Sequence, residues 1–202
     1  DPVQVRGVVI HQRASAGERK TVDQVPPQAQ GGSDGLDAHL VDRQALQDPT
    51  GAPPSSLGAR LGRGKPLLED PDRPKLAQNA KYDINVLSHD GIVVDGVRHD
   101  TMLESYVLDA TASRHDMDTL AKRHLDHDTI KYADVAGKGA KQLTFNQIDV
   151  EQATQYAAED ADITLRLHHA LWPRLEQEPS LQQVFEEIEI PLLPVLSRIE
   201  RT

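Results

Sequence analysis

The chain has 202 residues, a formal net charge of −10 and no cysteine. This length allows one or two domains with a real hydrophobic core, and the lack of cysteine excludes disulfides and thiolate metal sites. No apolar run approaches the roughly 20 residues that span a bilayer, and no signal peptide opens the chain, so a cytoplasmic protein without a membrane partner is expected. The acidic balance does not exclude a nucleic-acid cleft, because bound divalent ions reverse the field around a carboxylate cluster.

Composition divides the chain near Lys65-Pro66. Residues 1–65 contain no Phe, Tyr, Trp or Met, hold nine of the 13 glycines, and carry eight basic and seven acidic residues. Only residues 3–5 and 8–10 look strand-like there. So little apolar content cannot offset chain entropy, which predicts a disordered segment.

From residue 66 onward the apolar pattern predicts regular elements. We expect a short buried strand at residues 75–78, a helix over 82–88, a strand at 92–94 that ends in a turn at 95–96, and helices over 102–108 and 117–125.

Two longer helices follow in the pattern. Asp149 is a good N-cap, with Gln152 at the capping-box position. Apolar residues then line one flank of a long helix, and Pro173 is expected to end it soon after. A last helix is expected from about residue 181 to 199, kinked at Pro191 and Pro194. Because the chain begins with Asp1 rather than Met and ends inside this helical pattern, we expect a piece of a longer protein.

The most informative stretch is residues 156–162. Tyr156 and Asp160 are four residues apart and share one helix face, where a phenol and a carboxylate can position a water and hold a metal ion. With the upstream run Asn79-Ala80-Lys81-Tyr82-Asp83, this stretch resembles two of the three motifs of the 3′–5′ proofreading exonuclease domain of the A-type DNA polymerase I family. Further runs similar to that family follow in the same order over residues 66–202: 100–106, 113–121, 136–139, 142–148 and 191–201.

The resemblance implies an α/β, ribonuclease H-like 3′–5′ exonuclease fold, with a mixed sheet, flanking helices and early strands missing or disordered. Residues 66–180 would form a partial exonuclease domain, and residues 181–202 a helix leading into the polymerase domain of the same parent chain. The implied parent activity is two-metal hydrolysis of nucleotides from a single-stranded 3′ end of DNA, beside DNA synthesis.

Site residues follow from the same resemblance. Two Mg²⁺ ions would neutralise the phosphate and activate water, with Mn²⁺ or Zn²⁺ as substitutes. Asp83 and Asp160 match two of the family's four carboxylate ligands, and Tyr156 would orient the attacking water. Four residues would contact DNA: Asn79, Tyr82, Arg114 and Phe145.

The family's remaining motif, a close Asp-x-Glu pair on the first strand, does not occur in residues 1–82. Either residues 3–64 are an out-of-frame translation, or they are a genuine divergent or disordered segment. With two of four carboxylates the chain is expected to bind Mg²⁺ poorly, which favours a weak or inactive exonuclease-like domain that binds DNA or serves as a scaffold.

Three other features receive plainer interpretations. The density of His and Asp at residues 124–128 is typical of a solvated helix end rather than a zinc site. Gly137-Lys138-Gly139 lacks a Walker pattern and is expected to be a loop. His168 and His169 are expected to lie on a helix surface and to pack in part.

Overall fold

The computed structural model describes residues 9–10, 64–139, 142–143 and 147–202. Most of the segment 1–65 therefore lies outside the described residues, and so does Phe145.

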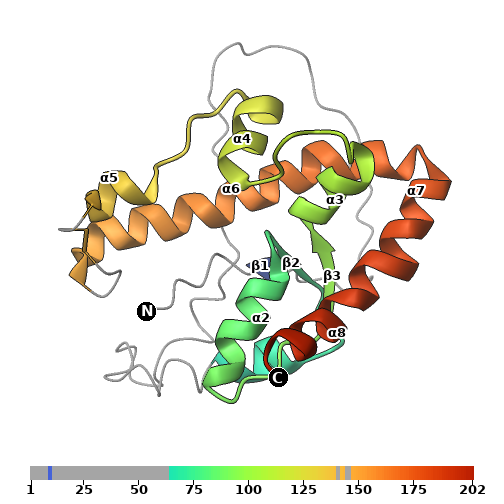
Figure 1. Ribbon diagram of the computed structural model, residues 1–202, viewed down its shortest axis with the longest axis horizontal. Coiled ribbons are helices and arrows are strands. Elements are labelled where there is room, and N and C mark those ends of the chain that lie inside the picture. The colour runs from blue at the N-terminus through green and yellow to red at the C-terminus, as the bar shows by residue number, and fades with distance from the viewer. Residues whose placement is uncertain (1–8, 11–63, 140–141, 144–146) are drawn as a thin grey trace, which may run out of the picture.

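A small mixed sheet lies near the centre of the described part (Figure 1). Its order is β1-β2-β3, with β1 (Val9–Ile10) antiparallel to β2 (Lys75–Ala77) and β2 parallel to β3 (Val97–Asp100). The register pairs Ala77 with Asp100, so the carboxyl ends of β2 and β3 lie side by side. The predicted mixed sheet and the buried strand at residue 75 are confirmed.

The strand predicted at residues 92–94 is wrong, because β3 forms a few residues later. The backbone of this stretch is bonded elsewhere. Asp95 donates its N–H to the carbonyl oxygen of Leu68 at 2.9 Å, and Val93 donates its N–H to Glu69 Oε1 at 3.0 Å. These acceptors lie in a short helix over residues 64–69, so the apolar run packs as a loop against that helix and not as a strand.

Gly96 turns the chain into β3. Its φ is +72°, and a Cβ atom there would lie 2.7 Å from the carbonyl oxygen of Arg73. The Gly96 carbonyl accepts the N–H of Lys75 at 2.9 Å, which ties the turn to the start of β2. The conformation and the close approach both require glycine here.

Helices surround the sheet, and the longest, α6, crosses the whole molecule (Figure 1). The predicted N-cap is confirmed, since the Asp149 side chain accepts the N–H of Glu151. Pro173 does not end α6, because the flanking Leu171 and Leu175 are fully buried and hold the last turn in place. The helices up to this point are α2 (Ala80–His89), α3 (Thr101–Leu108), α4 (Met117–Leu125), α5 (Tyr132–Ala136) and α6 (Val150–Glu176).

The apolar core has two parts. In the first, α4 packs on the middle of α6 through buried residues that include Leu120, Ile163 and Leu167. In the second, β2 and α2 pack against α8 (Ile190–Glu200) through Ala77, Ile84 and other buried residues. The chain therefore folds back on itself, and the C-terminal helix covers the helix that carries the second motif (Figure 1).

The predicted single last helix is divided into three. α7 (Pro179–Val184) leads into a π-helical turn, η3 (Phe185–Glu189), and α8 follows. Pro191 lies in the first turn of α8, where its missing N–H disturbs the preceding hydrogen-bond ladder. The wider turn lets Phe185 point into the core, where it is completely buried.

Candidate functional site

A pocket of about 190 Å³ lies where α4, α5 and α6 meet. Tyr156 and Asp160 line it from α6, and both side chains are buried. Tyr132 lines it from the start of α5, with its ring 6.3 Å from that of Tyr156 in an edge-on arrangement. Arg114 reaches it from the loop before α4. Three residues at the start of α4 complete the lining: Asp116, Met117 and Asp118.

The loop that carries Arg114 is held from two sides. Arg114 Nε donates to Asp116 Oδ2 at 2.7 Å, and Asp116 in turn caps α4 by accepting the N–H of Thr119. The neighbouring His115 is fixed by hydrogen bonds to Ser105 on α3 and to Gln78, which follows β2. The guanidinium group of Arg114 is exposed. The backbone that carries it is anchored through His115 to α3 and to the residue that follows β2.

Glu159, beside Asp160 on α6, fixes the loop that leads to Tyr132. Its Oε2 atom accepts the N–H of Ile130 at 2.6 Å, and its Oε1 atom lies 2.9 Å from His127 Nε2. Sequence reasoning missed both Tyr132 and Glu159. Glu159 lies inside the recognised 156–162 run, so its position was visible, whereas no local pattern marks Tyr132 as a partner of Tyr156.

The second motif is built around Asp100, which is completely buried at the end of β3. Its carboxylate accepts four backbone N–H groups, from Asn79 and Ala80 at the start of α2 and from Met102 and Leu103 at the start of α3. Burial raises the pKa of Asp100 to about 6, although these four hydrogen bonds act in the opposite direction. One carboxylate thereby fixes the start of both helices.

The predicted residues Asn79, Tyr82 and Asp83 all belong to this second motif. Asn79 adopts a left-handed conformation with φ of 62° just before α2, Tyr82 is 44% exposed, and Asp83 is buried one turn further along. The residues that line the pocket of Tyr156 include none of these three. The structure therefore gathers Arg114, Tyr156 and Asp160 in one pocket and leaves the second motif outside its lining.

A magnesium site would demand more of these carboxylates than their arrangement provides. Mg²⁺ requires about six oxygen ligands in octahedral geometry, and a two-ion site needs several carboxylates together. Within the described residues, neither Asp83 nor Asp160 joins two other His, Asp or Glu side chains in a group whose ligand atoms lie within 4.8 Å. The donors present in this part of the chain do not form a complete two-ion site.

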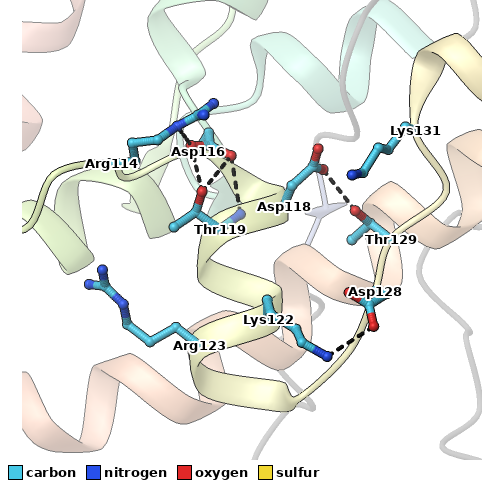
Figure 2. Close-up of a pocket in the computed structure, with 9 residues that line it drawn as sticks. All are labelled: Arg114, Asp116, Asp118, Thr119, Lys122, Arg123, Asp128, Thr129 and Lys131. Carbon is cyan, nitrogen blue, oxygen red and sulfur yellow. Dashed lines mark hydrogen bonds and ion pairs between the residues drawn. The ribbon is translucent and has the colours of Figure 1, made fainter.

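A second, larger pocket of about 460 Å³ adjoins the first along α4 and shares Arg114, Asp116 and Asp118 with it (Figure 2). Lys122 is engaged there by Asp126 and Asp128 at 3.1 and 2.9 Å. Figure 2 shows no such interaction for Arg123 or Lys131, whose side chains line the same pocket. The pocket therefore holds two cations that form no ion pair with the other residues drawn, Arg123 on α4 and Lys131 just before α5.

Residues 36–176 match the family model of the 3′–5′ exonuclease. The chain belongs to this exonuclease family. The match begins inside the segment 1–65 that looks atypical in composition, so the predicted boundary at residue 65 stays a prediction. Exonucleases of this family depend on divalent metal ions, and the α/β, ribonuclease H-like fold is confirmed.

Relatives of this chain include bacterial DNA polymerases. The chain is 66% identical over 139 residues to the DNA polymerase I of Pseudomonas aeruginosa and 51% identical over 140 residues to that of Rhizobium leguminosarum. These matches cover 68% and 69% of the chain but only 15% and 14% of the relatives, so the chain spans about a seventh of their length. A solved structure, the polymerase domain of Pol1 from M. smegmatis in complex with DNA primer-template and dNTP, aligns with a TM-score of 0.58 and 25% identity over 74% of this chain and 23% of that one.

No helix among the described residues combines the length and the apolar character needed to cross a membrane.

Proposed function

We propose that this chain is the exonuclease segment of a DNA polymerase I and binds the single-stranded 3′ end of DNA in the pocket of Tyr132, Tyr156 and Asp160. The observation that supports it most directly is the union of two tyrosine rings, a buried carboxylate and the exposed Arg114 around one space. Aromatic rings stack on any base, and a guanidinium group pairs with phosphate, so this set suits a strand end of any sequence.

The adjoining pocket along α4 extends this interface. Arg123 and Lys131 offer cationic groups to a phosphodiester backbone that continues away from the terminal nucleotide. The sequence-based contacts Asn79, Tyr82 and Phe145 remain proposals for the same strand. The net negative charge of the whole chain does not weaken the proposal. The attraction between these cations and a bound strand is local, because it extends over about one Debye length, roughly 8–10 Å at physiological salt.

Hydrolysis by this chain is proposed to be weak. The hydroxyl of Tyr156 and the carboxylate of Asp160 can hold and orient a water beside a phosphate, and Asp83 is proposed as a further metal ligand, in line with the family's divalent-metal dependence. The described donors nevertheless fall short of a two-ion set. The alternative function is therefore an exonuclease-like domain that binds DNA, or serves as a scaffold, without cleaving it.

A polymerase domain of the same parent chain is the proposed neighbour of α8. Five apolar side chains that are 38–65% exposed recur at helical spacing along α8 and the turn before it. They are Ile188 on η3 and Leu192, Val195, Leu196 and Ile199 on α8. An exposed apolar row on one helix face is typical of a surface that packs against another element. The opposite side of α8 is already bound to α2, where Glu200 contacts Lys81 and Asn85.

Binding is tested by fluorescence anisotropy with a labelled single-stranded oligonucleotide in the presence of EDTA. We expect Tyr132→Ala and Arg114→Ala each to weaken binding by roughly tenfold, since base stacking contributes about 1–3 kcal/mol and 1.4 kcal/mol is a factor of ten. Tyr132→Phe, which keeps the ring, and Arg198→Ala, on exposed α8, serve as matched controls. Unchanged affinity in both test variants would exclude this pocket as the DNA site.

Hydrolysis is tested separately by the release of nucleoside monophosphates from the 3′ end with Mg²⁺ or Mn²⁺. We expect little release from the wild-type chain, and loss of that residual release in Asp160→Asn. Rapid digestion that disappears in Asp160→Asn would show that the chain assembles a working metal site after all.

A further inference from the structure

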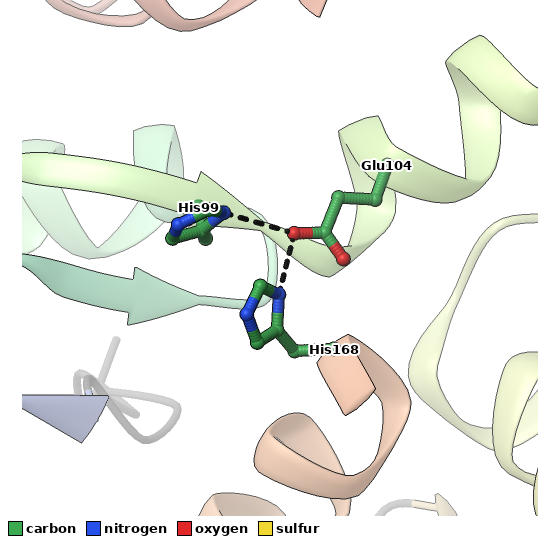
Figure 3. A group of neighbouring side chains, drawn as sticks. All are labelled: His99, Glu104 and His168. Atoms are coloured by element: carbon green, nitrogen blue, oxygen red, sulfur yellow. Dashed lines mark hydrogen bonds and ion pairs between the residues drawn. The ribbon is translucent and has the colours of Figure 1, made fainter. Parts of the chain in front are cut away.

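Three side chains of types that can bind a metal ion converge at a place that the exonuclease motifs do not use (Figure 3). They are His99 on β3, Glu104 on α3 and His168 on α6. Nδ1 of His168 lies at hydrogen-bond distance, 2.8 Å, from Glu104 Oε1, and Nδ1 of His99 lies 3.3 Å from the same oxygen without forming a hydrogen bond. His168 is thus buried in a polar cluster, and the expectation of a surface pair with His169 is wrong for this residue.

Two ligand atoms of this cluster lack hydrogen-bond partners among the described residues. They are His99 Nδ1 and Glu104 Oε2, and both atoms are buried. The Glu104 side chain is completely buried. A buried carboxylate oxygen without a partner costs free energy that most proteins avoid, and a bound cation is one of the few ways to satisfy it together with an imidazole nitrogen.

From this geometry we propose that His99, Glu104 and His168 form a zinc-binding site. Two imidazole nitrogens and one carboxylate oxygen are a typical Zn²⁺ donor set, whereas Mg²⁺ prefers oxygen ligands alone. Zinc bonds of about 2.0–2.1 Å in tetrahedral geometry hold neighbouring donor atoms roughly 3.3 Å apart. The three donor atoms already lie within 4.8 Å of one another, so small side-chain rotations suffice.

The surroundings fit an ion with three protein ligands and a fourth position open to water. His99 is a quarter exposed, so a water can supply the fourth ligand and the ion has a path of entry. Trp172 packs edge-on to the His99 ring at 4.5 Å, and the ring of Phe185 stacks beside it at 6.3 Å. The ion would join β3, α3 and α6 beneath the π-helical turn η3, and this role is independent of DNA cleavage.

The test uses the full 202-residue chain after treatment with a chelator. It is titrated with Co²⁺, whose visible ligand-field bands report tetrahedral coordination, and with Zn²⁺ by calorimetry. We expect one tightly bound ion, with affinity weakened by at least about tenfold in His99→Gln and in His168→Gln. His169→Gln, at the exposed neighbouring residue, is the matched control and should bind as the wild type does.

Asp160→Asn separates this site from the proposed exonuclease ligands. The ion should remain in this variant if the histidine cluster binds it, and should be lost if the signal comes from the exonuclease pocket. Thermal unfolding in EDTA shows whether each variant folds. If His168→Gln fails to fold because His168 is buried, His99→Gln still tests the site, since His99 is partly exposed. Absence of the Co²⁺ bands in the wild type, or unchanged affinity in both histidine variants, would overturn the proposal.

Discussion

Asp100 offers the sharpest test of how the second motif is held. The variant Asp100→Asn keeps the shape of the side chain but replaces one acceptor oxygen by a donor NH₂ group. In the folded chain Oδ1 accepts the N–H groups of Asn79, Met102 and Leu103, and Oδ2 accepts that of Ala80 at 2.6 Å. Whichever way the amide is oriented, at least one buried N–H loses its acceptor.

The expected loss of unfolding free energy at pH 7 is about 1–3 kcal/mol, the cost of leaving a buried donor unsatisfied. Asp100→Ala removes the acceptor for the first turns of α2 and α3 together. Two lost caps at about 1 kcal/mol each, with a small cavity in addition, give roughly 2–4 kcal/mol. Asp90→Asn, at the exposed residue that follows α2, should change stability by less than about 0.5 kcal/mol.

The pH dependence carries a distinct signature. The pKa of Asp100 is about 6 in the folded chain against an ordinary 3.8, so the folded state binds the proton more tightly than the unfolded state does. The stability that this group contributes is present below pH 3.8 and is lost as the pH rises through about 6. Between pH 7 and pH 4 the wild type should therefore gain about 2–3 kcal/mol relative to Asp100→Asn, which does not titrate.

Urea unfolding at pH 7, 6, 5 and 4 measures this difference, with Trp172 fluorescence and far-ultraviolet circular dichroism as probes. The comparison with Asp100→Asn cancels the other carboxylates, whose titration is common to both proteins. A stability difference that stays flat from pH 7 to pH 4 would refute the argument that burial, rather than hydrogen bonding, dominates at Asp100. Equal stability at pH 7 would refute the role of its four backbone contacts.

Further predictions concern the turn, the core and the loop of Tyr132. Gly96→Ala should destabilise the chain by about 1–3 kcal/mol in urea unfolding, because φ is +72° and the new Cβ would meet the Arg73 carbonyl oxygen; no loss would mean that the turn rearranges freely. Leu167→Ala, at a fully buried residue between α4 and α6, should cost about 2–5 kcal/mol in the same assay, and a cost below 1 kcal/mol would contradict the packing described. Glu159→Gln should leave the thermal midpoint nearly unchanged but weaken oligonucleotide binding severalfold. The reason is that it neutralises the carboxylate that holds His127 and the loop before Tyr132. An unchanged binding curve in the anisotropy assay would show that this loop does not contribute to DNA binding.

Local patterns predicted the elements whose causes are local. The helix over residues 117–125 was predicted at both ends, because Asp116 caps it and Leu120 and Ala121 provide its apolar face. Errors arose where distant groups decide the hydrogen bonds. The apolar residues 92–94 read as a strand, yet the N–H of Ile92 bonds to Leu87 on α2, and those of Val93 and Asp95 bond to the helix over residues 64–69.

The candidate site shows the same division. Tyr156 and Asp160 were predicted from their spacing on one helix, and Arg114 from its place in a recognised run; the structure puts all three in one pocket. Tyr132 was missed because its partner lies 24 positions away in the chain and nothing in its own neighbourhood marks it. The placement of Asn79, Tyr82 and Asp83 outside that lining was equally invisible in the sequence.

The sequence by itself determined the family and the helix spacing of Tyr156 and Asp160, because these depend on residues that are neighbours along the chain or within one turn. Only the tertiary structure decided which carboxylates meet other ligands. Glu104 reads as an ordinary helical acid, and His99 and His168 are 69 positions apart. Their convergence depends on the crossing of β3, α3 and α6, where burial removes water and leaves each polar atom to find a partner within the fold.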